Sequence, residues 1–291
     1  MSVVTGWVAG MTERPVLVLG ATGSTGRRVA ALLRAAGHPV RAASREGEVR
    51  FDWTLPETWG PALDGVSKMY LMAPDGVAVD PAFVAQAVER GVRRIVLLSA
   101  TAIEAMGDER LMAAERTVRA CGTAWTILRP TWFAQNFDEG LFRQDVMAGE
   151  LALPVGDLRQ AFVDADDVAA VAVKALTVTG HAGRRYELTG PAALSFAEAT
   201  AIVGRAAGHP VRFLGTREAY LDAQEAIGRS PAEVTAEIEA YAALRNLGDA
   251  EPGDVVRRVT GRAPKSFRRY AAEAAARGAW RDRATAGSRG A

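Results

Sequence analysis

The residues best suited to chemistry form a glycine-rich turn, Gly20-Ala21-Thr22-Gly23-Ser24-Thr25-Gly26. It lies between a short apolar run, Val16–Leu19, and a segment with helical apolar spacing, Ser24–Ala36. Glycines let the chain turn sharply and let main-chain atoms approach a diphosphate closely. The free N–H groups and the positive dipole end of the following helix attract the same diphosphate. In this strand–turn–helix context the spacing predicts a dinucleotide site, with a tight turn that binds nothing as the alternative.

Ser44 and Arg45 end the second predicted strand, Pro39–Ser44. An NAD site usually places an acidic residue there to hold the ribose hydroxyls. A hydroxyl and a guanidinium instead suit a 2′-phosphate, and Arg27 could add a second cation. These residues predict NADP(H) in preference to NAD(H), with solvated surface charges as the alternative interpretation of both arginines.

Strands and helices alternate along the first half of the chain, and this order decides which residues can meet. Further strands are expected at Met69–Met72, Ile95–Leu98 and Trp125–Leu128, and further helices after the Asp80-Pro81 cap and at Glu109–Ala120. The β-α-β-α order predicts a parallel sheet with helices on both faces. The expected fold is therefore α/β, a Rossmann-type doubly wound parallel sheet with a smaller, mostly helical C-terminal substrate lobe.

The predicted pattern changes after about residue 131. Tyr186–Leu188 could return as a last sheet strand, and Ser195 with Glu198 fits a capping box that opens a helix running to Ala207. We expect residues 15–190 to form the NAD(P)-binding domain, with a substrate-lobe insertion at about 132–160, and residues 191–281 to form the substrate-binding lobe. Residues 1–14 are expected to be a disordered or extended N-terminus, and residues 282–291 a flexible tail.

Composition narrows the classes of partner. The 291 residues carry a net charge of +1, which gives no reason to expect nucleic acid. No apolar run is long enough for a membrane span, and the single Cys121 fits a reducing, cytoplasmic location. Asp164, Asp166 and Asp167 are expected to cap the helix Val168–Leu176, and no metal site is expected. A small-molecule substrate is the expected partner, and a homodimer stays open.

Two further segments carry a family resemblance. Val96–Ala100 reads Val-Leu-Leu-Ser-Ala, and Trp125–Asn136 reads Trp-Thr-Ile-Leu-Arg-Pro-Thr-Trp-Phe-Ala-Gln-Asn. With the glycine-rich turn they resemble the NmrA-like atypical short-chain dehydrogenase/reductase family, and most closely its ergot-alkaloid festuclavine/agroclavine dehydrogenase branch with the bacterial relatives of that branch. The resemblance extends from about Val16 to about Ala275.

The resemblance implies further cofactor contacts. Asp52 would lie near the adenine, Ala73 and Pro74 along the path to the nicotinamide ribose, and Ser99 and Ala100 beside the nicotinamide. Each also has a structural alternative: Asp52 could cap a turn, Pro74 could end a strand, and Ser99 could be a strand-end hydroxyl.

The chain departs from the family at the catalytic position. Typical short-chain dehydrogenases use Tyr-x-x-x-Lys, in which the tyrosine exchanges a proton and the lysine lowers the pKa of the tyrosine. If Glu115 is the glutamate that follows this lysine by four residues in extended members, Leu111 replaces the lysine and Gly107 the tyrosine. Ordinary carbonyl chemistry is then in doubt, but a cationic iminium accepts hydride without a proton.

A candidate pocket follows the strand that ends at Leu128, because open α/β sheets bind ligands at the carboxyl ends of their strands. Its aromatic wall would be Trp132 and Phe133, which could equally be packing between the lobes. Polar groups that could orient a substrate are Thr131, Gln135 and Asn136. Further candidate lining residues are Met106, Phe137 and Phe162. No catalytic residue is assigned.

The sequence therefore predicts an enzyme, an NADP-dependent oxidoreductase that transfers hydride to a small organic electrophile. An iminium or imine in secondary metabolism is the first candidate substrate. The alternatives are an NmrA-like NAD(P)-binding redox sensor without turnover, a quinone or enone reductase, and a non-redox step on the same fold.

Overall fold

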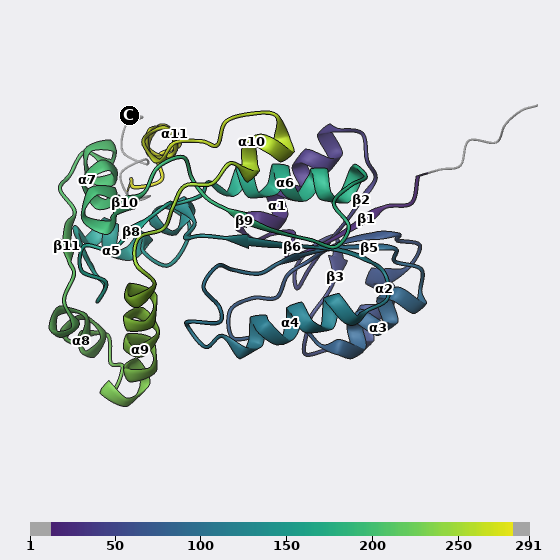
Figure 1. The fold of residues 1–291 in the computed structure, drawn as a ribbon, viewed down its shortest axis with the longest axis horizontal. Helices are drawn as coiled ribbons and strands as arrows, with labels where there is room; N and C mark the ends of the chain where they lie inside the picture. Colours follow the sequence, from purple (N-terminus) through teal and green to yellow (C-terminus); the bar gives the residue numbers. More distant parts are fainter. Residues whose placement is uncertain (1–12, 282–291) are drawn as a thin grey trace, which may run out of the picture.

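A seven-stranded sheet forms the centre of the computed structural model, which describes residues 13–281 (Figure 1). The strand order is β3-β2-β1-β4-β5-β6-β9, and each pairing is parallel. The strands are β1 (Val16–Leu19), β2 (Val40–Ser44), β3 (Val49–Arg50), β4 (Lys68–Leu71), β5 (Arg94–Leu98), β6 (Ala124–Pro130) and β9 (Arg184–Leu188). The predicted α/β class and the late return of the chain as β9 are confirmed. The predictions for residues 1–12 and 282–291 lie outside the described residues.

Helices cover both faces of the sheet (Figure 1). One face carries α1 (Ser24–Ala35), α6 (Ala165–Thr177) and α10 (Val255–Thr260), and the other carries α2 (Trp59–Leu63), α3 (Pro81–Glu89) and α4 (Glu109–Ala120). The two hydrophobic cores lie between these layers and the sheet. All four residues of β1 are at most 1% exposed, as expected of a strand buried on both faces.

The helix starts follow the predicted capping chemistry. The Asp80 side chain accepts a hydrogen bond from the N–H of Ala82 at the start of α3, and Pro81 occupies the first helical position. Ser195 and Glu198 form the expected capping box of α7 (Phe196–Ala207). Asp164 caps α6, so the acidic cluster serves the helix as predicted.

The remaining elements form a lobe at the carboxyl ends of the sheet strands (Figure 1). Its helices are α5 (Arg143–Ala148), α7, α8 (Arg217–Ala226), α9 (Pro231–Leu247) and α11 (Phe267–Ala276), with the short 3-10 helix η2 (Ala134–Phe137) beside them; a similar turn, η1 (Pro56–Thr58), precedes α2. Within residues 13–281, β7 (Glu150–Ala152) pairs with β11 (Arg212–Leu214), and β8 (Arg159–Gln160) pairs with β10 (Leu194–Ser195). These strands have two or three residues, too few to show a period of two in the sequence.

An aromatic core holds the lobe together. Phe137, Phe142, Phe162 and Phe196 are at most 2% exposed and contact one another edge to face. The chain then leaves the lobe, because α10 packs back on α6 and β9 before α11 returns to α7. The domain limits at residues 190 and 191 therefore stay a prediction. No helix within residues 13–281 is long and apolar enough to span a membrane.

Candidate cofactor and substrate site

The glycine-rich turn connects β1 to α1 and has no room for side chains at two positions. A Cβ at Gly26 would lie 2.2 Å from the carbonyl oxygen of Gly20, and Gly20 itself adopts a left-handed φ of +62°. Gly23 is the N-cap of α1 and provides no side-chain hydrogen bond to the helix, whose first turn contains no acidic residue. The amides of that turn therefore keep their donor capacity for an anion, as a dinucleotide diphosphate requires.

The end of β2 also fits a cofactor. The Ser44 hydroxyl is buried, and within residues 13–281 it has no hydrogen-bond partner. Arg45 is exposed beside it, and no acidic residue occupies this strand end. An unsatisfied buried hydroxyl is rare in folded proteins, so the ribose end of a dinucleotide is a suitable partner for it. The contact of Ser44 and Arg45 with a 2′-phosphate stays a prediction.

Arg27 does not join Arg45. It forms an ion pair with Glu139, which follows η2 and also pairs with Arg28 on the next position of α1. Ser24 donates a hydrogen bond to the same Glu139 carboxylate at 3.0 Å. Although burial raises it, the hydrogen bonds from Arg28 and Arg27 bring the pKa of Glu139 down to about 2. The expected help of Arg27 at the 2′-phosphate is therefore replaced by a contact between α1 and the lobe.

One of the contacts implied by the family resemblance, Asp52, has a local role in the structure. The Asp52 carboxylate accepts hydrogen bonds from the main-chain N–H and the hydroxyl of Thr54, at 2.9 and 2.8 Å, so Asp52 closes a turn. These bonds lower its pKa. Ala73 and Pro74 follow β4 at the carboxyl edge of the sheet, and their expected contact with the nicotinamide ribose stays a prediction.

Ser99 belongs to a buried ionic network. Its hydroxyl donates to Glu115 at 2.8 Å, and Arg129 on β6 contacts both oxygens of that glutamate at 2.6 and 2.9 Å. Arg129 also binds both oxygens of Glu104, in the segment that follows β5. The Ser99 hydroxyl thus donates its proton to Glu115 and not to a cofactor. Ala100 is half-buried and follows the strand end.

If Glu115 sets the alignment, Gly107 and Leu111 stand where typical short-chain dehydrogenases carry tyrosine and lysine, and neither side chain can donate a proton. Gly107 is an exposed turn residue with φ of +67°, and Leu111 lies in the first turn of α4. The neighbouring Ala102 also adopts a left-handed φ, +60°, which is rare for a residue with a side chain. Positions 107 and 111 therefore supply no acid, and the nearby Glu104 carboxylate binds Arg129.

The segment after β6 contains side chains that are hydrogen-bonded or buried inside the lobe and side chains that are half-buried. The Thr131 hydroxyl donates to the carbonyl of Ala161 at 2.6 Å. Gln135 donates to the carboxylate of Asp164 and accepts from the N–H of Ala165, so both side chains brace the lobe and are not free to orient a substrate. Phe137 and Phe162 are core residues at 0% and 2% exposure. Trp132, Phe133, Asn136 and Met106 remain half-buried.

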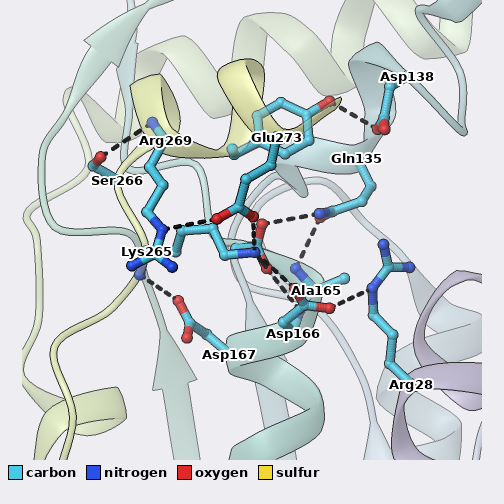
Figure 2. Close-up of polar contacts among 12 residues, drawn as sticks. Arg28, Gln135, Asp138, Ala165, Asp166, Asp167, Lys265, Ser266, Arg269 and Glu273 are labelled. Atoms are coloured by element: carbon cyan, nitrogen blue, oxygen red, sulfur yellow. Dashed lines mark hydrogen bonds and ion pairs between the residues drawn. The ribbon is translucent and has the colours of Figure 1, made fainter. Parts of the chain in front are cut away.

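Lys265 is the centre of a polar cluster that the sequence did not reveal. Figure 2 shows its ammonium group among carboxylates of α6 and α11, 2.7 Å from Asp166, 3.3 Å from Asp164 and 2.9 Å from Glu273. Arg28 of α1 binds the other oxygen of Asp166 at 2.7 Å. Lys265 and Asp166 are 99 positions apart in the sequence, so no local pattern could have identified their contact.

A second missed group lies on α8 and α9. The Tyr220 hydroxyl donates to Glu237 at 2.7 Å, and Arg229 contacts both oxygens of Glu237 at 2.8 and 3.0 Å. The Tyr241 ring stacks on Trp132 with a centroid distance of 6.3 Å and an interplanar angle of 16°. Glu237 and Tyr241 are four residues apart on α9 and so share a face, but that spacing alone indicates no function.

A family model described as NAD(P)H-binding matches residues 20–179. The NAD(P)H azoreductase of Xenophilus azovorans is 35% identical to this chain over 91% of this chain and 99% of that protein. The (4-alkanoyl-5-oxo-2,5-dihydrofuran-3-yl)methyl phosphate reductase of Streptomyces griseus is 36% identical over 89% and 97% of the two chains. Festuclavine synthase I of Penicillium roqueforti is 31% identical over 88% and 96%.

Solved structures share the fold. The NADPH-dependent quinone oxidoreductase of Escherichia coli complexed with NADPH has a TM-score of 0.69 at 20% identity, covering 89% of this chain and 99% of that one. NmrA, a negative transcriptional regulator, in complex with NADP has a TM-score of 0.64 at 16% identity, covering 90% and 95%. The predicted kinship with the ergot enzymes and their bacterial relatives is confirmed, and these two bacterial reductases match at the higher identity. The chain shares the fold of NmrA, and it belongs to the NAD(P)H-binding family together with these bacterial reductases and festuclavine synthase I.

Proposed function

We propose that this protein is an NADPH-dependent reductase that transfers hydride to a small, flat organic electrophile. The observation that carries the proposal is the open start of α1, where Gly23 caps the helix without a side chain and no acidic residue follows in the first turn. A dinucleotide diphosphate supplies the negative charge that this helix end attracts. When bound, the nicotinamide provides the hydride, and the protein provides orientation and a dry surrounding.

The residues at the end of β2 support NADPH over NADH. An NAD site needs an acceptor for the ribose hydroxyls, and Ser44-Arg45 offers a hydroxyl and a cation instead. The guanidinium of Arg45 suits a phosphate because it can form two parallel hydrogen bonds. The single free cysteine, Cys121, supports a reducing, cytoplasmic location for such an enzyme.

Two observations support the class of hydride acceptor: the absence of the tyrosine and lysine, and the reactions for which the relatives are named. With Gly107 and Leu111 in place of tyrosine and lysine, the position typical of the family delivers no proton, and an iminium of secondary metabolism needs none. Relatives at 35% and 36% identity are named for the reduction of azo compounds and of a furanone phosphate. We therefore take a cyclic iminium as the first acceptor and conjugated quinones and enones as the second.

The test is NADPH consumption with a panel of defined acceptors. Purified protein is mixed with NADPH or NADH and with an N-alkyl cyclic iminium, a quinone or an enone, and cofactor absorbance and product are followed together. We expect oxidation with at least one acceptor, and faster oxidation with NADPH. Tight NADPH binding without turnover would instead favour a redox sensor, and product without cofactor consumption would favour a non-redox step.

A further inference from the structure

Glu139 places a negative charge on the helical turn that the cofactor diphosphate needs. Its carboxylate accepts a hydrogen bond from the Ser24 hydroxyl at 3.0 Å, and it pairs with Arg27 at 2.5 Å and with Arg28 at 2.8 Å. All three partners lie in α1, where Ser24 is the first residue after the Gly23 cap, whereas Glu139 comes from the lobe, just after η2. Although burial raises it, the arginine contacts lower the pKa of Glu139 to about 2, so the carboxylate is ionised at neutral pH. The positive end of α1 therefore has an internal anion beside it.

This internal anion and a diphosphate use different atoms of the same turn. The hydrogen bonds that Glu139 accepts from α1 come from the side chains of Ser24 and Arg28. A dinucleotide diphosphate binds the main-chain N–H groups at a helix start, and nearby cations stabilise its negative charge. The two anions therefore need not displace each other, yet they draw on the same hydroxyl and the same guanidinium groups. Each group that Glu139 holds is one that the diphosphate lacks.

The two arginines differ in how firmly the protein holds them. The Arg28 side chain is 14% exposed, and it also binds Asp166 of α6 at 2.7 Å (Figure 2) and the main-chain carbonyl of Ser24 at 2.8 Å. The Arg27 side chain is 42% exposed, and within residues 13–281 its ion-pair partner is Glu139. An exposed guanidinium can turn from a carboxylate to a phosphate and form two parallel hydrogen bonds there. Arg27 and the Ser24 hydroxyl are therefore the groups that a phosphate can take from Glu139, while Arg28 stays anchored.

We propose that Glu139 competes with the cofactor phosphates for Arg27 and Ser24, and so weakens the binding of NADP(H). The inference rests on the proposed function, because that function places the diphosphate at the start of α1. Binding exchanges one set of contacts for another: Arg27 and the Ser24 hydroxyl leave the carboxylate and contact a phosphate, and Arg28 alone keeps Glu139. Because the carboxylate gives up favourable contacts, the net gain in binding free energy is small. The contact with the lobe thus lowers cofactor affinity and favours release of the oxidised cofactor after each turnover.

The first test is the NADPH affinity of Glu139→Gln, measured by calorimetry. Glutamine keeps the size of the side chain and an acceptor for the Ser24 hydroxyl, but it removes the charge and so frees Arg27 for a phosphate. We expect about tenfold tighter NADPH binding, the effect of one added charge-assisted hydrogen bond. Glu89→Gln is the matched control, since it removes the same charge at the exposed end of α3, near the amino edge of the sheet, and should leave the affinity unchanged. A purely structural role for Glu139 predicts the opposite sign, weaker binding.

The second test is a double-mutant cycle between positions 27 and 139. Arg27→Ala should change NADPH affinity little in the wild-type background, where Glu139 holds the guanidinium, and should weaken it about tenfold in the Glu139→Gln background. Equal effects in the two backgrounds would show that Glu139 does not withhold Arg27, and unchanged or weaker NADPH binding by Glu139→Gln would show that it does not compete. Either result overturns the inference and leaves the proposed function standing, because NADPH still binds. A wild-type protein that binds no NADPH would overturn the proposed function and the inference with it.

Discussion

The starts of α1 and α6 lie side by side on one face of the sheet and are built in opposite ways. Asp164 caps α6, and Asp166 and Asp167 follow in its first turn. Gly23 caps α1, whose first turn has no acidic residue and no side-chain cap. Both helices have the same unpaired N–H groups and the same positive dipole end. The chain therefore satisfies one helix start with its own carboxylates and leaves the other for the charge of a ligand.

The charged side chains around the N-terminal ends of the two helices differ in the same way. At α6 the carboxylates are paired by Lys265, Arg28 and Arg262. At α1 the nearby carboxylate is Glu139, and Arg27 and Arg28 neutralise it. Substitutions at α6 should therefore change stability and leave cofactor affinity intact, whereas substitutions at α1 should do the reverse.

The largest effect is expected for Lys265→Met. The Lys265 side chain is 11% exposed and that of Asp164 1%, so the change leaves the buried carboxylate of Asp164 without its cation. Breaking one side of a buried ion pair destabilises proteins by about 3–5 kcal/mol, which denaturant unfolding should show. Lys174→Met, at an exposed position of α6, is the control and should change stability little. A loss below about 1 kcal/mol would mean that the cluster is not what stabilises this helix start.

Gly23→Asp makes α1 resemble α6. Gly23 has φ −79° and ψ 177°, an extended conformation close to that of Asp164, so an aspartate can cap the helix there. The added Cβ lies 3.2 Å from the carbonyl oxygen of Gly20, a close contact that capping offsets, so stability should change little. The carboxylate occupies the diphosphate site and repels the diphosphate, which weakens NADPH binding about a hundredfold or more. Calorimetry measures the affinity, and Gly23→Asn, a neutral cap, separates charge from bulk. Unchanged affinity in Gly23→Asp would remove the phosphate site from α1.

The sequence predicted the N-terminal end of α1 better than the surroundings of the N-terminal end of α6, for a physical reason. Gly20 to Gly26 encode their own conformation within seven residues, and Asp164 encodes its own cap. Lys265 meets Asp166 from 99 positions away, and nothing local predicts that pairing. Gln135 and Thr131 were expected to face a substrate because their segment follows a strand, but hydrogen bonds to Asp164 and Ala161 turn them inward. Tyr241 was missed since Trp132 reaches it only through the folded lobe.

Arg45→Ala tests whether the cofactor site at the start of α1 extends to the end of β2. The guanidinium at the end of β2 should contact the 2′-phosphate together with Ser44, so its loss should weaken NADPH binding about tenfold. NADH binding should stay the same because it has no 2′-phosphate, and the ratio of the two affinities is the measurement. Arg34→Ala, whose side chain pairs with Glu48, is the control. An equal loss for both cofactors would show that Arg45 does not select between them.

The smallest effect is expected where the two regions meet, at Glu139. Because the pKa of its carboxyl falls to about 2 in the folded protein from an ordinary 4.5, the ionised group stabilises the fold above about pH 4.5, and this contribution disappears as the pH falls toward 2. Glu139→Gln should therefore be about 1 kcal/mol less stable than wild type at neutral pH, with the difference closing in acid. Unfolding midpoints over this pH range measure it. Glu109→Gln, at a side chain that is 77% exposed, is the control and should change stability little at neutral pH. A pH-independent difference at position 139 would mean that the carboxylate charge does not hold the lobe to α1.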